Sequence, residues 1–323
     1  MTSSLLLLII ADSNAPVIKT MPALPKDVRV VISNRFEELM PHAPEADAIL
    51  YADGDGALLA RVLTLAKRAR WIHSLWTGVE GILKPEILNH VAPLTNGRGV
   101  FRWPLADWVV AMMMYFSFDF PRVLQQQREQ VWKPFISKTI SGQMLGIVGY
   151  GAIGSAAAAR ARVFDMKIGA LRRRPEMFDG DVLVDQNYAP NQLKDLMAAS
   201  DFLLVCTPLT EQTRGLIGEA EIAAMKPSAV LINVGRGPVV NEAALIRALQ
   251  SGAIRGAALD VFDTEPLPAD HPFWKMPQVF VSPHTADRVE GFLKPAWESF
   301  LENLNRFRRS QTLLNVVDKQ AGY

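Results

Sequence analysis

The stretch that decides the fold is Met144-Leu145-Gly146-Ile147-Val148-Gly149-Tyr150-Gly151-Ala152-Ile153-Gly154. Its first five residues are an apolar run typical of a buried parallel strand, and the alanine-rich segment 155–164 predicts a helix. The loop between them reads Gly-x-Gly-x-x-Gly. In such a unit the first glycine permits a tight turn, the second admits a phosphate, and the third lets the helix approach the sheet. The stretch predicts a dinucleotide-binding unit, and a glycine turn without a ligand is the alternative.

The end of the next predicted strand, Lys167–Leu171, indicates which dinucleotide is bound. NAD-specific units carry an acidic residue there, about twenty residues into the unit, which binds the ribose hydroxyls. This chain instead has Arg172, Arg173 and Arg174. A guanidinium donates two parallel hydrogen bonds to a phosphate, so the segment suits the 2′-phosphate of NADPH. We expect NADP(H) to be preferred, with NAD(H) possible, and Arg172 and Arg173 to make the contact; a solvated basic turn is the alternative.

Composition sets the broad class of the protein. The chain has 323 residues, enough for two domains, and is 49% apolar and 21% charged with a net charge of +1. Such a balance gives no general attraction to nucleic acid or to an anionic membrane. The single cysteine, Cys206, excludes an internal disulfide framework and favours a reducing compartment. We therefore expect a cytoplasmic protein without a nucleic-acid or membrane partner.

Two apolar segments require a separate interpretation. Leu5–Ile10 has no basic residue before it and Asp12 soon after, which favours a buried strand over a signal peptide. The run 109–120 is interrupted by Asp119 and is too short to span a bilayer. Within a predicted helix over 104–120, apolar residues occupy nearly every face from Trp108 to Phe116. We expect this helix to be buried between domains or between the subunits of a homodimer.

Alternating strand and helix signals predict two parallel α/β sheets. The expected strands of the first are 5–10, 28–32, 48–51, 71–74 and 91–94, and those of the second are 144–148, 167–171, 202–206, 230–234, 257–261 and 279–281. An amphipathic helix over 289–309 can return the end of the chain to the first sheet.

Three segments that follow successive strands of the second sheet carry polar residues suited to catalysis. They contain Arg236, Glu265 and His284. In a parallel sheet, ligands bind outside the carboxyl ends of the strands, so these residues converge on the edge that carries the glycine loop. A histidine can supply the proton that an alkoxide needs after hydride transfer, and a carboxylate on its other ring nitrogen favours the charged form. An arginine can bind a substrate carboxylate or carbonyl oxygen.

With these motifs the chain resembles the D-2-hydroxyacid dehydrogenase family over essentially its whole length. The resemblance runs from Trp76-Thr77-Gly78-Val79-Glu80 to His284, and it implies a catalytic set of Arg236, Glu265 and His284. It also implies a Rossmann-type dinucleotide domain, residues 100–286, and a flavodoxin-like substrate domain made from both chain ends, residues 1–99 plus 287–323. The basic cofactor segment and Trp132 look most like the NADPH-dependent glyoxylate/hydroxypyruvate reductase branch.

The resemblance assigns further residues to the two binding sites. The cofactor site is expected to comprise Gly149, Gly151, Ala152, Ile153, Gly154, Arg172, Arg173, Thr207, Pro208, Val234 and Asp260. The substrate site is expected to comprise Trp76, Thr77, Gly78, Val79, Arg236 and His284, with the N–H groups of the first-domain loop binding a carboxylate. No metal site is expected.

The sequence departs from the family pattern at two places. Trp76-Thr77-Gly78-Val79-Glu80 replaces the common Gly-Ala-Gly-Val-Asp, and Asp287-Arg288 replaces small residues after His284. An aromatic wall at Trp76, with Trp132 of the partner subunit as a further candidate, leaves space for a small substituent on a 2-oxo acid. We expect reduction of glyoxylate, hydroxypyruvate or a similar acid to the D-2-hydroxy acid, with His284 as proton donor.

Two other functions share these motifs. A dinucleotide-sensing interaction protein of the same fold would also bind the cofactor, but no disordered recruitment segment accompanies the motifs. An NAD-dependent oxidiser of formate or phosphite would share the Arg/Glu/His set, and the arginine cluster argues against it. The remaining histidines lack catalytic partners in sequence, and we interpret His271 as a structural loop residue and Cys206 as buried packing.

Overall fold

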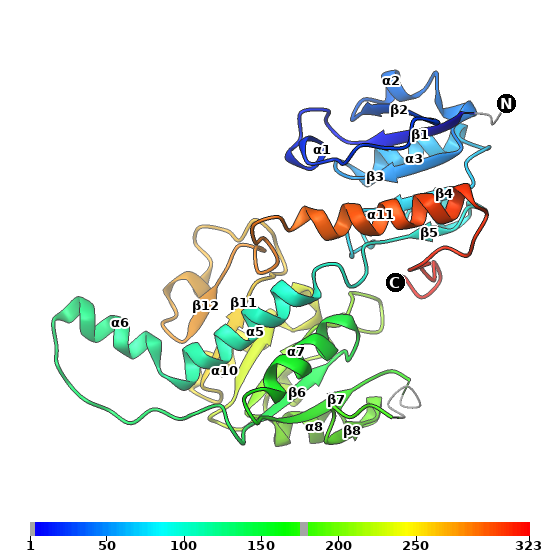
Figure 1. The fold of residues 1–323 in the computed structure, drawn as a ribbon. Helices are drawn as coiled ribbons and strands as arrows, with labels where there is room; N and C mark the ends of the chain where they lie inside the picture. Colours follow the sequence, from blue (N-terminus) through cyan, green and yellow to red (C-terminus); the bar gives the residue numbers. More distant parts are fainter. Residues whose placement is uncertain (1–3, 175–179) are drawn as a thin grey trace. The chain divides into compact units, whose positions relative to one another are not determined.

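The computed structural model describes residues 4–174 and 180–323 and divides into two compact units (Figure 1). Unit 1 comprises Met1–Phe101 and Glu290–Tyr323, and unit 2 comprises Arg102–Val289. Each unit is built on one sheet, of five strands in unit 1 and seven in unit 2, and every paired strand is parallel. Two α/β units with parallel sheets confirm the predicted fold class.

Unit 1 combines the N-terminal part of the chain with its last helix. Its strands are β1 (Leu5–Ile10), β2 (Val28–Ser33), β3 (Ala48–Tyr51), β4 (Trp71–Ser74) and β5 (Leu94–Thr95), and its helices are α1 (Pro16–Lys19), α2 (Phe36–Leu39), α3 (Gly56–Leu65), α4 (Pro85–Leu88) and α11 (Leu293–Arg308). The strand order β2-β1-β3-β4-β5 is that of a flavodoxin-like sheet. The apolar runs form these strands because both faces of the sheet are covered, so residues such as Leu8 and Ile49 are fully buried.

Helix α11 is fixed to the N-terminal sheet by large aromatic contacts. The Phe300 ring stacks on Trp71 of β4 at 5.5 Å between centroids, and both side chains are buried. The Trp297 indole N–H donates to the Val17 carbonyl at 3.2 Å. An ion pair between Arg308 and Asp27 closes the far end of the helix. Burial of these rings, each of which removes roughly 150–250 Å² from water, makes the C-terminal helix a part of the N-terminal unit.

One strand of unit 1 differs from the sequence prediction. We expected a strand over 91–94, whereas β5 begins only at Leu94. The Val91 side chain is 92% exposed, and Pro93 has no N–H to donate to a neighbouring strand. The apolar run was therefore misread, because its first residues form a surface turn.

Unit 2 contains the glycine loop. Its strands are β6 (Met144–Val148), β7 (Lys167–Leu171), β8 (Gln186–Tyr188), β9 (Phe202–Val205), β10 (Val230–Asn233), β11 (Gly256–Leu259) and β12 (Val279–Val281), and its helices are α5 (Arg102–Ser117), α6 (Phe120–Glu129), α7 (Ala152–Arg162), α8 (Leu193–Ala199), α9 (Glu219–Ile222) and α10 (Glu242–Ser251). The strand order is β12-β11-β10-β9-β6-β7-β8. Strand order reverses at β6, so the loop after β6 lies at the switch point where doubly wound sheets bind ligands.

The apolar helix α5 is buried inside unit 2. It packs against α7, and its Tyr115 and Trp108 rings contact Phe280 of β12 edge-on. At Gly256 of β11 an added Cβ would lie 2.7 Å from the Phe116 ring, so that glycine makes room for the helix. We expected α5 to be buried between domains or between subunits. Eight of its sixteen residues are buried within the chain, and burial of the others against a partner subunit stays a prediction.

Two elements of unit 2 were not predicted from the sequence. The helix expected over 104–120 ends at Ser117, because Asp119 takes a left-handed φ of 54°, and α6 begins after it. In Figure 1, α6 projects away from the unit 2 sheet. Strand β8, Gln186-Asn187-Tyr188, is polar, with only Tyr188 buried. Neither element has the apolar periodicity on which the prediction relied.

A buried histidine lies in the core of unit 1. His73 of β4 is 0% exposed, and its Nδ1 atom lies 2.6 Å from the hydroxyl of Thr95 on β5. The same hydroxyl accepts a hydrogen bond from the Trp71 indole at 2.8 Å. Nε2 of His73 has no hydrogen-bond partner among the described residues. Burial lowers the pKa of His73 to about 3, so the folded chain holds this imidazole neutral.

We predict that His73 makes the protein sensitive to acid. Its pKa is lower in the folded chain than in the unfolded chain, so unfolding takes up a proton between about pH 6.5 and pH 3, and stability falls as the pH falls through that window. The asparagine side chain of His73→Asn cannot be protonated. In this variant the free energy of unfolding should therefore depend on pH less steeply, by about 1.4 kcal/mol per pH unit. Urea unfolding at several pH values, followed by tryptophan fluorescence, measures it. Equal slopes in the two proteins would contradict a buried neutral His73.

Candidate active site

The glycine loop after β6 has room for a ligand on one side only. Gly149 has a φ of +99°, and an added Cβ there would lie 2.6 Å from the Thr207 side chain. At Gly154 an added Cβ would lie 2.9 Å from Ile147, which explains how closely α7 approaches the sheet. Gly151 has no atom within 4 Å of an added Cβ. The loop therefore packs directly against the protein at Gly149 and Gly154 and leaves open space at Gly151. At Gly151 the N-terminal end of α7 presents N–H groups that have no partner within the helix.

A buried hydroxyl lies beneath the same loop. The Thr207 Oγ1 atom is buried and has no hydrogen-bond partner in the part of the chain that the structure describes. The segment after Thr207 is ordered by its own side chains, since the Thr213 hydroxyl donates to the Pro208 carbonyl at 2.7 Å and accepts from the Thr210 N–H. Buried polar groups without a partner are rare and indicate a missing ligand or water. Thr207 and the open face of Gly151 fit a bound dinucleotide.

The basic segment at the end of β7 is held against the glycine loop. The Nε atom of Arg172 donates to the Tyr150 carbonyl at 3.0 Å, and its guanidinium carbon lies 4.8 Å from the centre of the Tyr150 ring. Arg172 is half-buried, whereas Arg173 and Arg174 are exposed. Arg172 therefore has a fixed position next to the loop.

Arg236 is placed by a turn that only glycine permits. Asn233, at the end of β10, accepts a hydrogen bond from the Gly235 N–H at 3.0 Å and donates to the Arg236 carbonyl at 3.1 Å. At Gly237 an added Cβ would lie 1.9 Å from the carbonyl carbon of Phe262, so the turn crosses directly over the chain that leaves β11. Glycine at 237 therefore allows Arg236 to reach the same edge as Glu265.

Glu265 and His284 form a hydrogen-bonded pair. The Nδ1 atom of His284 lies 2.7 Å from Oε2 of Glu265, and the other carboxylate oxygen accepts from the Phe262 N–H at 3.0 Å. The side chain of His284 is 45% exposed, and that of Glu265 is 35% exposed. Because Nδ1 donates to the carboxylate, Nε2 is the nitrogen left to exchange a proton with a substrate.

A buried carboxylate positions the loop that carries His284. Asp260, only 2% exposed, accepts hydrogen bonds from the Ser282 hydroxyl at 2.6 Å and from the N–H groups of Thr285 and Ala286 at 2.9 and 3.1 Å. His284 itself has a φ of +52°, a left-handed conformation that is uncommon for a residue with a side chain. The bonds on either side of His284 hold it in that conformation. We expected Asp260 to bind the cofactor; its observed partners are these loop residues.

The charges at the pair favour a protonated imidazole. The hydrogen bond to Glu265 raises the pKa of His284, and this outweighs burial, which lowers it. Burial works to raise the pKa of Glu265, but its bonds to His284 and to the Phe262 N–H, together with the charges of His284 and Arg236, lower it overall. Asp287 nearby has a pKa that burial raises. The pair is an ion pair when His284 carries its proton.

The predicted substrate loop belongs to unit 1. The Thr77 carbonyl accepts from Asn96, its hydroxyl donates to the Gly97 carbonyl, and the Trp76 indole N–H donates to the Ala52 carbonyl at 2.8 Å. By contrast, among the described residues no acceptor pairs with the N–H groups of Thr77, Gly78 and Val79. Three consecutive unpaired N–H groups are suited to an anion such as a carboxylate. The rest of the loop is fixed, which leaves these donors as its binding face.

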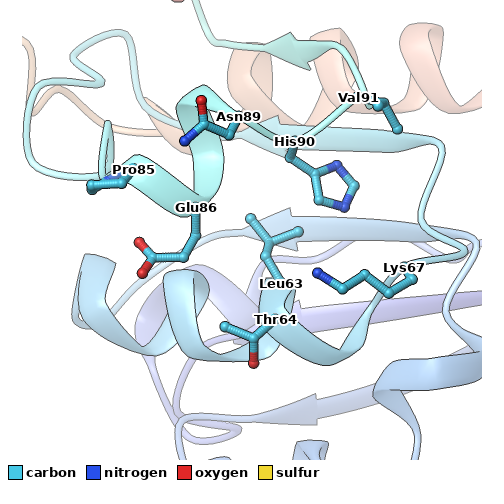
Figure 2. Close-up of a pocket in the computed structure, with 8 residues that line it drawn as sticks. All are labelled: Leu63, Thr64, Lys67, Pro85, Glu86, Asn89, His90 and Val91. Atoms are coloured by element: carbon cyan, nitrogen blue, oxygen red, sulfur yellow. The ribbon is translucent and has the colours of Figure 1, made fainter.

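Other candidate sites carry less chemistry. An open pocket of about 550 Å³ in unit 1 is lined by Leu63, Thr64, Lys67, Pro85, Glu86, Asn89, His90 and Val91, and it contains none of the predicted site residues (Figure 2).

Within residues 4–174 and 180–323 no group of three His, Cys, Asp or Glu side chains is placed to hold a metal ion. No helix in those ranges has the length and apolarity to cross a membrane. His271 bonds to Glu242 and caps the short turn at 272–275, in line with a structural role.

Some site residues were not found from the sequence. Contacts between distant parts of the chain give Tyr150, Asn233 and Asp260 their roles. Residue spacing in the sequence does not reveal such contacts. Asn233 was visible only as part of a motif around Arg236. Glu242 has no sequence signal linking it to His271, which lies 29 residues away.

Comparison with known proteins identifies the family. Residues 110–286 match the family model of the D-isomer specific 2-hydroxyacid dehydrogenase NAD-binding domain. The chain belongs to the D-isomer specific 2-hydroxyacid dehydrogenase family. The glyoxylate reductase of Korarchaeum cryptofilum (strain OPF8) is 35% identical over 270 residues, which cover 81% of this chain and 80% of that protein. Membership confirms the family resemblance seen in the sequence.

Two further proteins extend the comparison. Glyoxylate/hydroxypyruvate reductase B of Citrobacter koseri is 34% identical over 288 residues, which cover 83% of this chain and 87% of that protein. The crystal structure of the dehydrogenase from Xanthobacter autotrophicus Py2, in complex with NADPH and MES, superposes with a TM-score of 0.86 at 28% identity. The superposition covers 99% of this chain and 100% of the Xanthobacter autotrophicus chain.

We predict that the Glu265–His284 bond sets the titration of His284. The wild-type imidazole should titrate above pH 6.5, the ordinary value for histidine, because Glu265 stabilises the imidazolium. In Glu265→Gln the anion is lost, so the midpoint should move to lower pH. Histidine NMR signals followed against pH measure the change, and the signal is assigned by its loss in His284→Ala. The other histidine signals serve as the control, and an unchanged midpoint for His284 would rule out the pairing.

Proposed function

We propose that the chain is an NADPH-dependent reductase of small 2-oxo acids that forms the D-2-hydroxy acid. The observation that carries the proposal is the hydrogen-bonded pair of His284 and Glu265, which lies at the carboxyl edge of the sheet that bears the glycine loop. Its relatives named glyoxylate reductase and glyoxylate/hydroxypyruvate reductase B support the reaction class. In this proposal unit 2 binds the dinucleotide, and the unit made from both chain ends binds the substrate.

The roles of the residues follow from their chemistry. The reduced nicotinamide supplies a hydride to the carbonyl carbon when it is bound. His284, protonated at Nε2 and held at Nδ1 by Glu265, gives its proton to the carbonyl oxygen, which becomes the hydroxyl of the product. Arg236 stabilises the negative charge that develops on that oxygen or binds the substrate carboxylate. Asp260 acts by holding the His284 loop.

For the cofactor, Gly149, Gly151 and Gly154 with Ala152 and Ile153 at the start of α7 are proposed to hold the pyrophosphate. Thr207, Pro208 and Val234 line the adjoining strand ends of β9 and β10. Arg172 and Arg173 are proposed to bind the 2′-phosphate, which makes NADPH the preferred form. The NADPH complex of the Xanthobacter autotrophicus protein supports this choice.

For the substrate, we propose that the N–H groups of Thr77, Gly78 and Val79 bind the carboxylate. Trp76 is fixed by its bond to Ala52 and by stacking against Phe101, with ring centroids 6.3 Å apart. A fixed indole next to the carboxylate leaves space for a small substituent on the 2-oxo carbon. Glyoxylate and hydroxypyruvate are therefore the proposed substrates.

Steady-state kinetics test the reaction. With NADPH, glyoxylate and hydroxypyruvate should give a higher kcat/KM than pyruvate or phenylpyruvate, and NADH should be the poorer cofactor. His284→Ala should lower kcat by about 10²–10⁴-fold, the scale of general acid catalysis, while the Kd of NADPH stays the same. His42→Ala is the matched control and should retain wild-type kcat. Absence of turnover on every 2-oxo acid, with NADPH still bound, would favour a dinucleotide-sensing protein instead.

We propose in addition that the protein is a homodimer that uses α6 and the segment after it. Large apolar side chains are exposed here, with Trp132 at 97%, Ile136 at 98% and Leu124 at 41%, and α6 has no buried residue. Its contacts with its own chain include Tyr115 of α5, whose ring lies 6.0 Å from that of Phe120. A helix that buries none of its residues and exposes such side chains is typical of an interface. This moves the predicted interface from Trp108–Phe116 to the neighbouring helix.

We predict that sedimentation of the wild type at micromolar concentration gives twice the 35.7 kDa chain mass. The double variant Leu124→Asp with Trp132→Asp should be a monomer. Dimerisation would then require each subunit to bury two charged side chains in the interface, which is energetically costly. Val91→Asp, which alters an equally exposed apolar residue in unit 1, is the control and should remain dimeric. A monomeric wild type would contradict the proposal.

A further inference from the structure

The residue between the first two glycines of the loop supports the basic segment. Tyr150 follows Gly149, and its ring is 3% exposed. Arg172 lies over one face of that ring, with 4.8 Å between the guanidinium carbon and the ring centre, and its Nε donates to the Tyr150 carbonyl at 3.0 Å. One residue thus holds the arginine in two ways, through its ring and through its main chain.

Tyr150 is itself fixed. Its N–H donates to the carbonyl of Leu171, the last residue of β7, at 3.2 Å. Burial raises the pKa of the Tyr150 phenol far above its usual range, and the Asp181 carboxylate raises it further, so the hydroxyl keeps its proton. Tyr150 is therefore anchored at its main chain, and its ring is enclosed by the surrounding protein. A guanidinium seated on it has a rigid support.

Rigidity matters for an arginine that is to recognise a phosphate. The side chain has roughly 2 kcal/mol of rotamer entropy in solution, and a planar fork that is already oriented loses less of it on binding. Aromatic faces attract a guanidinium through their quadrupole, and the attraction is stronger where the ring is out of water.

We propose that Tyr150 is a positioning residue for recognition of the 2′-phosphate of the dinucleotide, acting by holding Arg172. The inference rests on the proposed use of NADPH and adds that the selectivity depends on the glycine loop as well as on the arginines. Tyr150 binds no part of the phosphate. Its replacement should weaken ligands that carry a 2′-phosphate and leave those without one nearly unchanged.

Binding to the purified protein tests the proposal without turnover. Isothermal titration calorimetry with 2′,5′-ADP and with 5′-ADP gives a ratio of Kd values that reports on the 2′-phosphate alone. Tyr150→Leu removes the ring but keeps the main-chain carbonyl, and it should raise the Kd of 2′,5′-ADP by about three- to tenfold while changing that of 5′-ADP by less than about twofold. Tyr150→Phe keeps the ring and should retain most of the selectivity.

A double-mutant cycle with Arg172→Met separates positioning from simple packing. If Tyr150 acts through Arg172, Tyr150→Leu should have no further effect on the ratio once Arg172 is replaced. If Tyr150→Leu does not fold, Tyr150→Met, which also removes the ring but is unbranched and can adapt to the space, should reduce the ratio in the same direction. Circular dichroism establishes folding for each variant.

The outcomes distinguish the two proposals. A wild type that binds both nucleotides equally would refute the preference for NADPH. A wild type that prefers 2′,5′-ADP, together with folded Tyr150→Leu or Tyr150→Met variants that keep the full ratio, would overturn the role of Tyr150 and leave the NADPH proposal standing. Equal weakening of both nucleotides would also overturn it, because that result indicates damage to the loop.

Discussion

Parallel pairing of the unit 2 strands is the constraint on which the site depends. Because all seven strands run in one direction, their carboxyl ends lie on one edge, and every loop that leaves this edge is brought near the others. The loops that carry Gly151, Arg236, Glu265 and His284 are far apart in the chain and meet for this reason. The close approach at Gly237, where no side-chain carbon fits beside Phe262, shows how tightly two of these loops are packed.

The same constraint explains how much the sequence revealed. The apolar runs and the glycine loop predicted the sheets, and the strand ends then placed Arg236, Glu265 and His284 on a common edge. Strand β8 was missed because it is polar, and α6 was missed because only the backbone at Asp119 separates it from α5. Contacts such as Tyr150 with Arg172 depend on side-chain orientation, which residue spacing does not determine.

Two histidines in one chain illustrate how surroundings decide a role. His73 lies among aromatic rings, and its Nδ1 atom contacts one hydroxyl group, so burial keeps the imidazole neutral. His284 is half-exposed and bonded to a carboxylate, so its charged form is stabilised. His73 lies within β4, and His284 lies in the loop that follows β12. A partner distant in sequence gives His284 its chemistry.

The stacking of Phe300 on Trp71 bears on how the chain matures during synthesis. Unit 2 is one continuous segment, so all of its residues have left the ribosome once Val289 has emerged. Unit 1 is completed later, because its β4 strand is made before unit 2 while the helix that covers Trp71 is made after it. Throughout that interval the first sheet lacks one of its layers, and its aromatic surface is open to chaperones or to another nascent chain. Unit 1, whose first 101 residues are made before unit 2, is thus completed after it.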